Sequence, residues 1–78
     1  MSEKRNQFKG LIVRLYGSQR AMSKALGVSG QTVQNWVNEN PRGMLSHVPE
    51  IVGRTYISYE DLIKEIVEYD DHLNELFI

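Results

Sequence analysis

The fold of this chain is decided by the stretch YGSQRAMSKALGVSGQTVQNWV, residues 16–37. The pattern predicts two short helices joined by a tight turn. Gly17 can end a preceding helix, and the hydroxyl of Ser18 can cap the first of the two short helices. One face of this helix is apolar, with residues at helical spacing: Ala21, Met22, Ala25 and Leu26.

The second short helix has an unusual outer face. Leu26-Gly27-Val28 ends the first helix, and Ser29 can cap the second. The second helix has an apolar inner face, made of Val33, Trp36 and Val37, and an amide-rich outer face, made of Gln31, Gln34, Asn35 and Asn38. Solvated faces usually favour Lys and Glu, whereas an amide carries a donor and an acceptor together, as the reading of base edges requires. The pattern therefore favours nucleic-acid recognition.

A longer helix is predicted before this stretch, over residues 5–16. Its apolar residues form one stripe: Phe8, Leu11, Ile12 and Leu15. Gly10 lowers the stability of this helix by about 0.5–1 kcal/mol relative to Ala. We therefore expect the helix to depend on packing against the two that follow.

After the amide-rich helix, Asn40-Pro41-Arg42-Gly43 matches a type I turn. Ser46 can then cap a short fourth helix that extends to about Val52, with Pro49 tolerated in its first turn. Gly53 is expected to end that helix.

Residues 54–57, RTYI, allow two interpretations. Their aromatic and β-branched side chains favour a short strand that could pair across a dimer. Against the strand, residues 58–61 resemble a capping box with Asp in place of Glu, and apolar residues continue at helical spacing: Leu62, Ile63, Ile66, Val67, Leu73, Leu76 and Phe77. We favour a fifth helix, either continuous from residue 59 to about 76 or restarting near Asp70.

The length of 78 residues allows one domain, near the lower limit for a single core. The predicted fold class is all-α, a small domain of about five helices. Residues 1–57 would form a DNA-binding core around the motif at 18–37, and residues 58–78 an acidic helix that completes the core.

The net charge of −1 hides a division of the chain into two halves. Residues 1–45 hold seven Lys and Arg against two Glu, a net charge of +5. Residues 46–78 hold two basic and eight acidic residues, a net charge of −6. The basic half can approach phosphate and the acidic half would be repelled from it, so we expect the two halves to face different partners.

Composition argues against catalysis and against metal binding. The chain has no cysteine, and His47 and His72 have no partners at ligand spacing. Asp61, Glu65 and Glu68 could pair as catalytic or metal-binding carboxylates, but we expect no cleft in so small a helical domain and interpret them as a solvated face. We therefore expect no enzyme activity, no metal, no cofactor and no small-molecule ligand.

The sequence also predicts a cytoplasmic location. The first ten residues, MSEKRNQFKG, are charged and contain no apolar signal region, and no run approaches the roughly 18 apolar residues of a membrane helix. The absence of cysteine fits a reducing compartment.

The segment around Leu26-Gly27-Val28 resembles the helix-turn-helix of the Cro repressors of lambdoid phages, and most closely their all-helical branch. In such motifs a glutamine or similar residue opens the first helix, a small residue lies four before the turn glycine, and branched or aromatic residues lie six and nine after it. These are Gln19, Ser23, Val33 and Trp36. The pattern covers roughly 22 of the 78 residues, and the stretch 41–51 is similar in character.

The chain departs from the family pattern at two positions. Ser23 replaces the more usual alanine, so its hydroxyl must find an acceptor. Gly30 stands at the start of the recognition helix, where many relatives present a side chain to a base. One contact is therefore missing there or is made by the backbone.

The resemblance implies a sequence-specific repressor of phage or prophage origin that acts at the bacterial nucleoid. Such a protein occupies a near-palindromic operator in double-stranded DNA as a homodimer and excludes polymerase or a competing repressor. Two alternatives stay open. One is an activator resembling the phage CII proteins, with a tetramer built by the C-terminal helix. The other is an antitoxin or anti-repressor type of protein-interaction module, whose acidic half binds a basic partner.

Roles follow from how such a motif enters the major groove. The first choices for reading bases are Gln31 and Gln34, with Asn35 and Ser29 as weaker candidates. The expected phosphate contacts are Gln19, Arg20 and Lys24, with Arg14 and Arg42 as outer clamps. Asn38 has two alternative predicted roles, contacting DNA or capping the C-terminal end of its helix. Apolar residues beyond what one small core needs predict the self-association surface: Leu62, Ile66, Leu73, Leu76 and Phe77.

Overall fold

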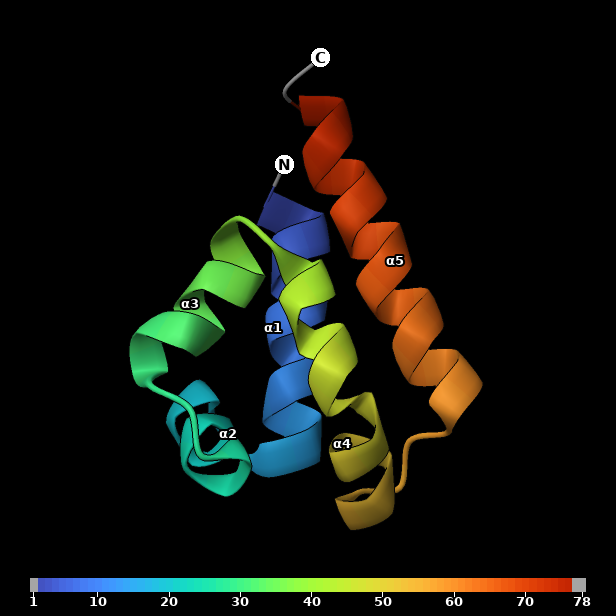
Figure 1. The fold of residues 1–78 in the computed structure, drawn as a ribbon. Coiled ribbons are helices and arrows are strands. Elements are labelled where there is room, and N and C mark those ends of the chain that lie inside the picture. The colour runs from blue at the N-terminus through green and yellow to red at the C-terminus, as the bar shows by residue number, and fades with distance from the viewer. Residues whose placement is uncertain (1, 77–78) are drawn as a thin grey trace.

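The computed structural model describes residues 2–76, and within this range all regular structure is helical (Figure 1). The elements are α1 (Ser2–Tyr16), α2 (Gln19–Leu26), α3 (Gly30–Asn38), the 3-10 helix η1 (Pro41–His47), α4 (Val48–Arg54) and α5 (Tyr59–Leu76). The predicted all-α fold is confirmed. None of the described helices is both long and apolar enough to cross a membrane.

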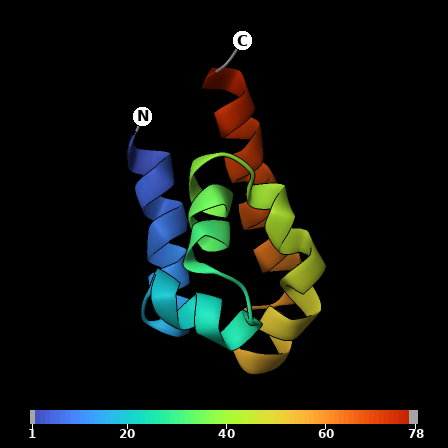
Figure 2. The ribbon, with the colours of Figure 1, turned by 60° about the vertical axis from the view of Figure 1, so that its left-hand side comes forward.

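Helix α1 begins three residues earlier than predicted, at Ser2. Its stripe behaves as expected, since Phe8, Leu11 and Ile12 are buried and Leu15 is half-buried. The start of α1 and the end of α5 lie at the same end of the molecule (Figures 1 and 2). The two helices therefore run in opposite directions, and they contact each other.

The turns on either side of α2 are built as the sequence predicts. Gly17 and Gly27 have φ of 93° and 70°, a left-handed backbone conformation that glycine adopts without a steric cost. The hydroxyl of Ser18 accepts a hydrogen bond from the Ala21 amide at 3.0 Å, and the hydroxyl of Ser29 accepts one from the Thr32 amide at 3.1 Å. These local contacts fix where α2 and α3 begin.

The segment after α3 differs from the prediction. The amide of Gly43 donates to the carbonyl of Asn40 at 3.1 Å, as in a turn, but the chain then continues as η1 and passes directly into α4. Ser46 does not cap α4, since its hydroxyl donates to the Gly43 carbonyl at 3.4 Å, and Gly53 lies within α4. A buried stripe at spacings of three and four explains the continuity: Pro41, Met44, Val48 and Ile51.

Helix α5 settles the choice left open for residues 54–57. These residues form no strand with any other part of residues 2–76, and the Ser58 hydroxyl accepts from the Asp61 amide at 3.1 Å. The helix then continues without a break through Asp70, which lies inside it instead of capping a restart. The favoured prediction of a fifth helix is confirmed.

The side of α5 that was expected to hold a partner faces the core of its own chain. Leu62, Ile66 and Leu73 are at most 5% exposed. They belong to the same buried core as residues of α1, η1 and α4, the elements that α5 contacts, so they offer no surface to a second molecule in this fold. The Leu76 side chain and Phe77, the remaining members of that set, lie outside the described part of the chain.

Trp36 requires a glycine at position 43. A Cβ atom added to Gly43 would lie 2.5 Å from Nε1 and 2.7 Å from Cδ1 of the Trp36 ring. The ring is only 5% exposed, so it has little room to move aside.

We therefore predict that Gly43→Ala lowers the free energy of unfolding by about 1–3 kcal/mol, the usual cost of overpacking. Urea denaturation followed by Trp36 fluorescence measures it. Gly53→Ala is the matched control, because Gly53 lies in the last turn of α4 and a Cβ there meets nothing within 4 Å. It should be neutral or stabilising by up to about 1 kcal/mol. Equal effects of the two changes would contradict the assigned contact.

Candidate nucleic-acid interface

Helices α2 and α3 enclose a surface groove of about 520 Å³. Its lining residues come from both helices: Gln19, Arg20, Ser23, Lys24, Gly30 and Gln34. None of them is acidic. The turn at Gly27 thus brings the cations of α2 beside the first turn of α3 and beside the Gln34 amide in the middle of α3.

The cations of this groove project from successive turns of α2. Arg20 and Lys24 are both exposed, and neither forms an ion pair with any residue in the range 2–76. Ser23 lies between them and is buried, with its hydroxyl donating to the Arg20 carbonyl at 2.7 Å. The hydroxyl of Ser23 therefore has its acceptor within α2. Because Arg20 and Lys24 have no acidic partner in this range, both can interact with an anion.

The amides of α3 are arranged in two ways. Nε2 of Gln31 donates to Oδ1 of Asn35 at 3.1 Å, which joins these exposed side chains into a pair. The pair still offers the Gln31 oxygen as an acceptor and the Asn35 nitrogen as a donor. Gln34 is exposed and has no side-chain hydrogen bond to the described chain, so both ends of its amide are available.

Ser29 is less available than the amides. Its hydroxyl accepts from the Thr32 amide and also lies 2.9 Å from the Thr32 hydroxyl, a contact in which either oxygen could be the donor. Both interactions serve the start of α3. A contact from Ser29 to a base would compete with them, so we place Ser29 as a capping residue.

Gly30 helps to form the hollow itself. A Cβ atom at this position would meet nothing within 4 Å, and the residue lines the groove. The backbone would therefore accept a side chain here without strain. Whether the backbone of Gly30 contacts a base stays a prediction.

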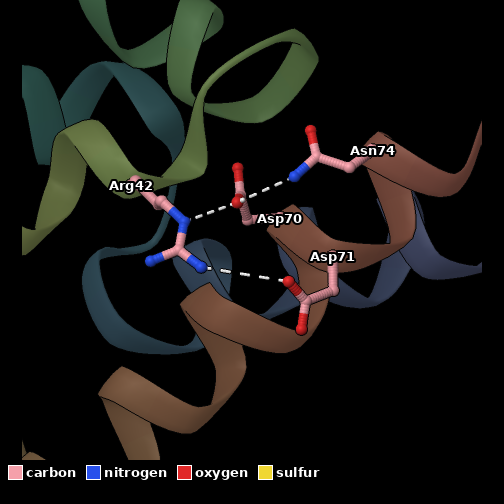
Figure 3. A network of polar contacts seen from close by, with 4 residues as sticks. All are labelled: Arg42, Asp70, Asp71 and Asn74. Atoms are coloured by element: carbon pink, nitrogen blue, oxygen red, sulfur yellow. Dashed lines mark hydrogen bonds and ion pairs between the residues drawn. The ribbon is translucent and has the colours of Figure 1, made fainter. Parts of the chain in front are cut away.

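Arg42 is engaged elsewhere. Its Nε lies 2.6 Å from Oδ2 of Asp70 and its Nη2 3.9 Å from Oδ1 of Asp71, while Asn74 donates to Asp70 at 3.4 Å (Figure 3). Asp70 is only 6% exposed, so Arg42 neutralises a buried carboxylate. Arg42 therefore joins η1 to α5, which differs from the predicted role as a phosphate clamp.

Two other predicted phosphate contacts also lie outside the groove. Arg14 is on the outer face of α1, where it lines a separate hollow with Glu3 and Glu65. Asn38 is exposed at the end of α3, and its side chain forms no hydrogen bond with the described residues, so it does not cap the helix. The structure thus brings together Gln19, Arg20 and Lys24 and leaves the other three apart.

One contact to α2 is not predicted by the sequence. Nη1 of Arg54, in α4, donates to the carbonyl of Ala25 at 3.5 Å. This bond supports the end of α2 from a helix that lies 29 positions along the chain. The sequence pattern gives no sign of this contact. It pairs Arg54 with Glu50, four residues earlier on the same helix, and the structure also contains that pair, at 3.8 Å.

The described residues hold no group of three or more potential metal ligands. Comparisons with protein-family models, with curated proteins and with solved structures find no match for this chain. The interpretation of the groove therefore rests on its own geometry and charge, together with the resemblance seen in residues 16–37.

The structural role of Arg42 is testable by stability. Arg42→Ala would leave the buried Asp70 carboxylate with only the long hydrogen bond from Asn74. We predict a loss of about 1–3 kcal/mol in the free energy of unfolding, below that of a fully buried pair because the Arg42 side chain is half-exposed. Lys64→Ala, which removes an exposed cation that forms no ion pair within residues 2–76, is the control and should change stability by no more than about 0.5 kcal/mol. Urea denaturation measures both variants. If Arg42→Ala left the free energy of unfolding unchanged, Arg42 would have no structural role and would again be a candidate for phosphate contact.

Proposed function

We propose that this protein is a sequence-specific DNA-binding repressor that inserts α3 into the major groove. The observation that carries the proposal is the groove between α2 and α3, in which unpaired cations lie next to an exposed amide. A major groove about 12 Å wide admits one helix, and the helix before it then lies across the phosphate backbone.

The amides of α3 support recognition of base edges. Gln34 can donate and accept at once, as a bidentate contact to adenine N6 and N7 requires. The Gln31–Asn35 pair presents one acceptor and one donor in a fixed relation, because each amide holds the other. Charged side chains are absent from α3 altogether, so its specificity would come from hydrogen bonding.

The charge distribution supports the same orientation. Arg20 and Lys24 would meet phosphate from α2, while α5, which holds most of the carboxylates, lies on the opposite side of the molecule from α2 (Figure 1). DNA approaching the groove therefore meets cations first. Repression would follow from occupancy alone, by exclusion of polymerase or of a competing protein, in keeping with the Cro-type resemblance.

The amide roles predict a loss confined to cognate DNA. Gln34→Ala and Gln31→Ala should each weaken binding to a selected operator by about 1–3 kcal/mol and leave binding to random DNA nearly unchanged. Fluorescence anisotropy titrations with both DNAs measure this. Equal losses of affinity for both DNAs would show that these amides do not read bases.

The cation roles predict a change in salt dependence. Arg20→Ala and Lys24→Ala should each lower the slope of log K against log salt by about one unit, because each removes one phosphate contact. Lys64→Ala is the matched control, since Lys64 is an exposed cation on α5, away from the groove, and its slope should not change. A slope unaltered by Arg20→Ala would place the phosphate strand elsewhere.

A first experiment separates DNA binding from the protein-interaction alternative. A gel shift with pooled genomic DNA at two salt concentrations should show retention that weakens at the higher salt. No retention at either concentration would favour a protein partner.

A further inference from the structure

The outer face of α1 is left mostly exposed by its own chain. It lies opposite the buried stripe and consists of residues at helical spacing: Glu3, Asn6, Gln7, Gly10, Val13 and Arg14. Val13 is 51% exposed, one of only three large apolar side chains that the described residues expose to this degree. Most of these residues line a hollow of about 750 Å³, to which α5 contributes Glu65.

Gly10 lies near the centre of this face, and no contact or backbone conformation within the chain requires a glycine there. Its φ is not positive, and an added Cβ would meet nothing within 4 Å. Glycine in a helix interior lowers helix stability relative to Ala. A bare backbone at the middle of an exposed helix does, however, let another helix approach closely.

The charges on this face have opposite signs at its two ends. Glu3 lies at the start and Arg14 at the end, and neither forms an ion pair within residues 2–76. If a second α1 packs antiparallel about a two-fold axis between residues 8 and 9, Glu3 lies opposite the partner's Arg14 and Gln7 opposite the partner's Gly10. A parallel arrangement would instead set Glu3 against Glu3 and Arg14 against Arg14.

We propose that a second copy of this chain docks on this face, with the two α1 helices antiparallel. The face is self-complementary, as a two-fold interface must be, with two ion pairs at its ends and Gly10 near its centre. It replaces the buried side of α5 as the site of self-association. The proposal would supply the dimer that the proposed function calls for, but it does not depend on DNA binding, because self-association is measured on the protein alone.

Charge reversal tests the pairing. Sedimentation equilibrium of the full chain without DNA should show a reversible dimer. Glu3→Arg and Arg14→Glu should each raise its dissociation constant at least about tenfold, because each sets like charges opposite one another twice. Mixing the two variants in equal amounts should restore the dimer, since every Arg then faces a Glu.

A wild-type chain that stays monomeric at several hundred micromolar would overturn the proposal. So would variants that keep the wild-type dissociation constant, or a mixture that stays monomeric. Each of these results leaves the DNA titrations above interpretable, so failure of the interface is distinguishable from failure of DNA binding.

Gly10→Gln gives an independent readout. Glutamine is neutral and a better helix former than glycine, so the urea midpoint of the monomer should rise or stay unchanged. The dissociation constant of the dimer should nevertheless rise at least about tenfold, because the new side chain separates the two helices. A more stable monomer with an unchanged dimer would show that no helix approaches Gly10.

Discussion

Tyr69 holds three helices together from a single position on α5. Its ring stacks on Phe8 of α1 with centroids 4.5 Å apart, and its hydroxyl donates a hydrogen bond to the Val37 carbonyl in the last turn of α3. The residue is 3% exposed, so the hydrogen bond satisfies a polar group that burial would otherwise leave unpaired. Through this bond α5 helps to hold the end of α3, together with the contacts of α3 with α2, η1 and α1, although α5 contributes nothing to the groove.

The sequence predicted those parts of the fold that depend on near neighbours. Ser18, Ser29 and Ser58 cap their helices through contacts three residues away, so their patterns are visible in any short window. Contacts between distant residues were missed. The pair of Arg42 with Asp70 spans 28 positions. The continuation of η1 into α4 was missed for another reason: residues 40–43 match a turn, although the buried residues from Pro41 to Ile51 lie at helical spacing.

The candidate site was predicted in part, for the same reason. Gln19, Arg20 and Lys24 share a groove because they lie on one short helix whose start the sequence locates. Arg14 and Arg42 were assigned by charge alone, and charge does not reveal which face a residue occupies. Apolar spacing found the buried side of α5 but could not decide whether its own chain or a partner covers it.

The proposed function requires that α3 reads a DNA sequence. Selection of bound sites from a random double-stranded DNA pool measures this. We expect enrichment of a motif made of two inverted half-sites, whose centres lie about 10 base pairs apart if one helical turn separates the two recognition helices. A pool that stays random after repeated rounds of selection, while the protein remains folded, would contradict the claim.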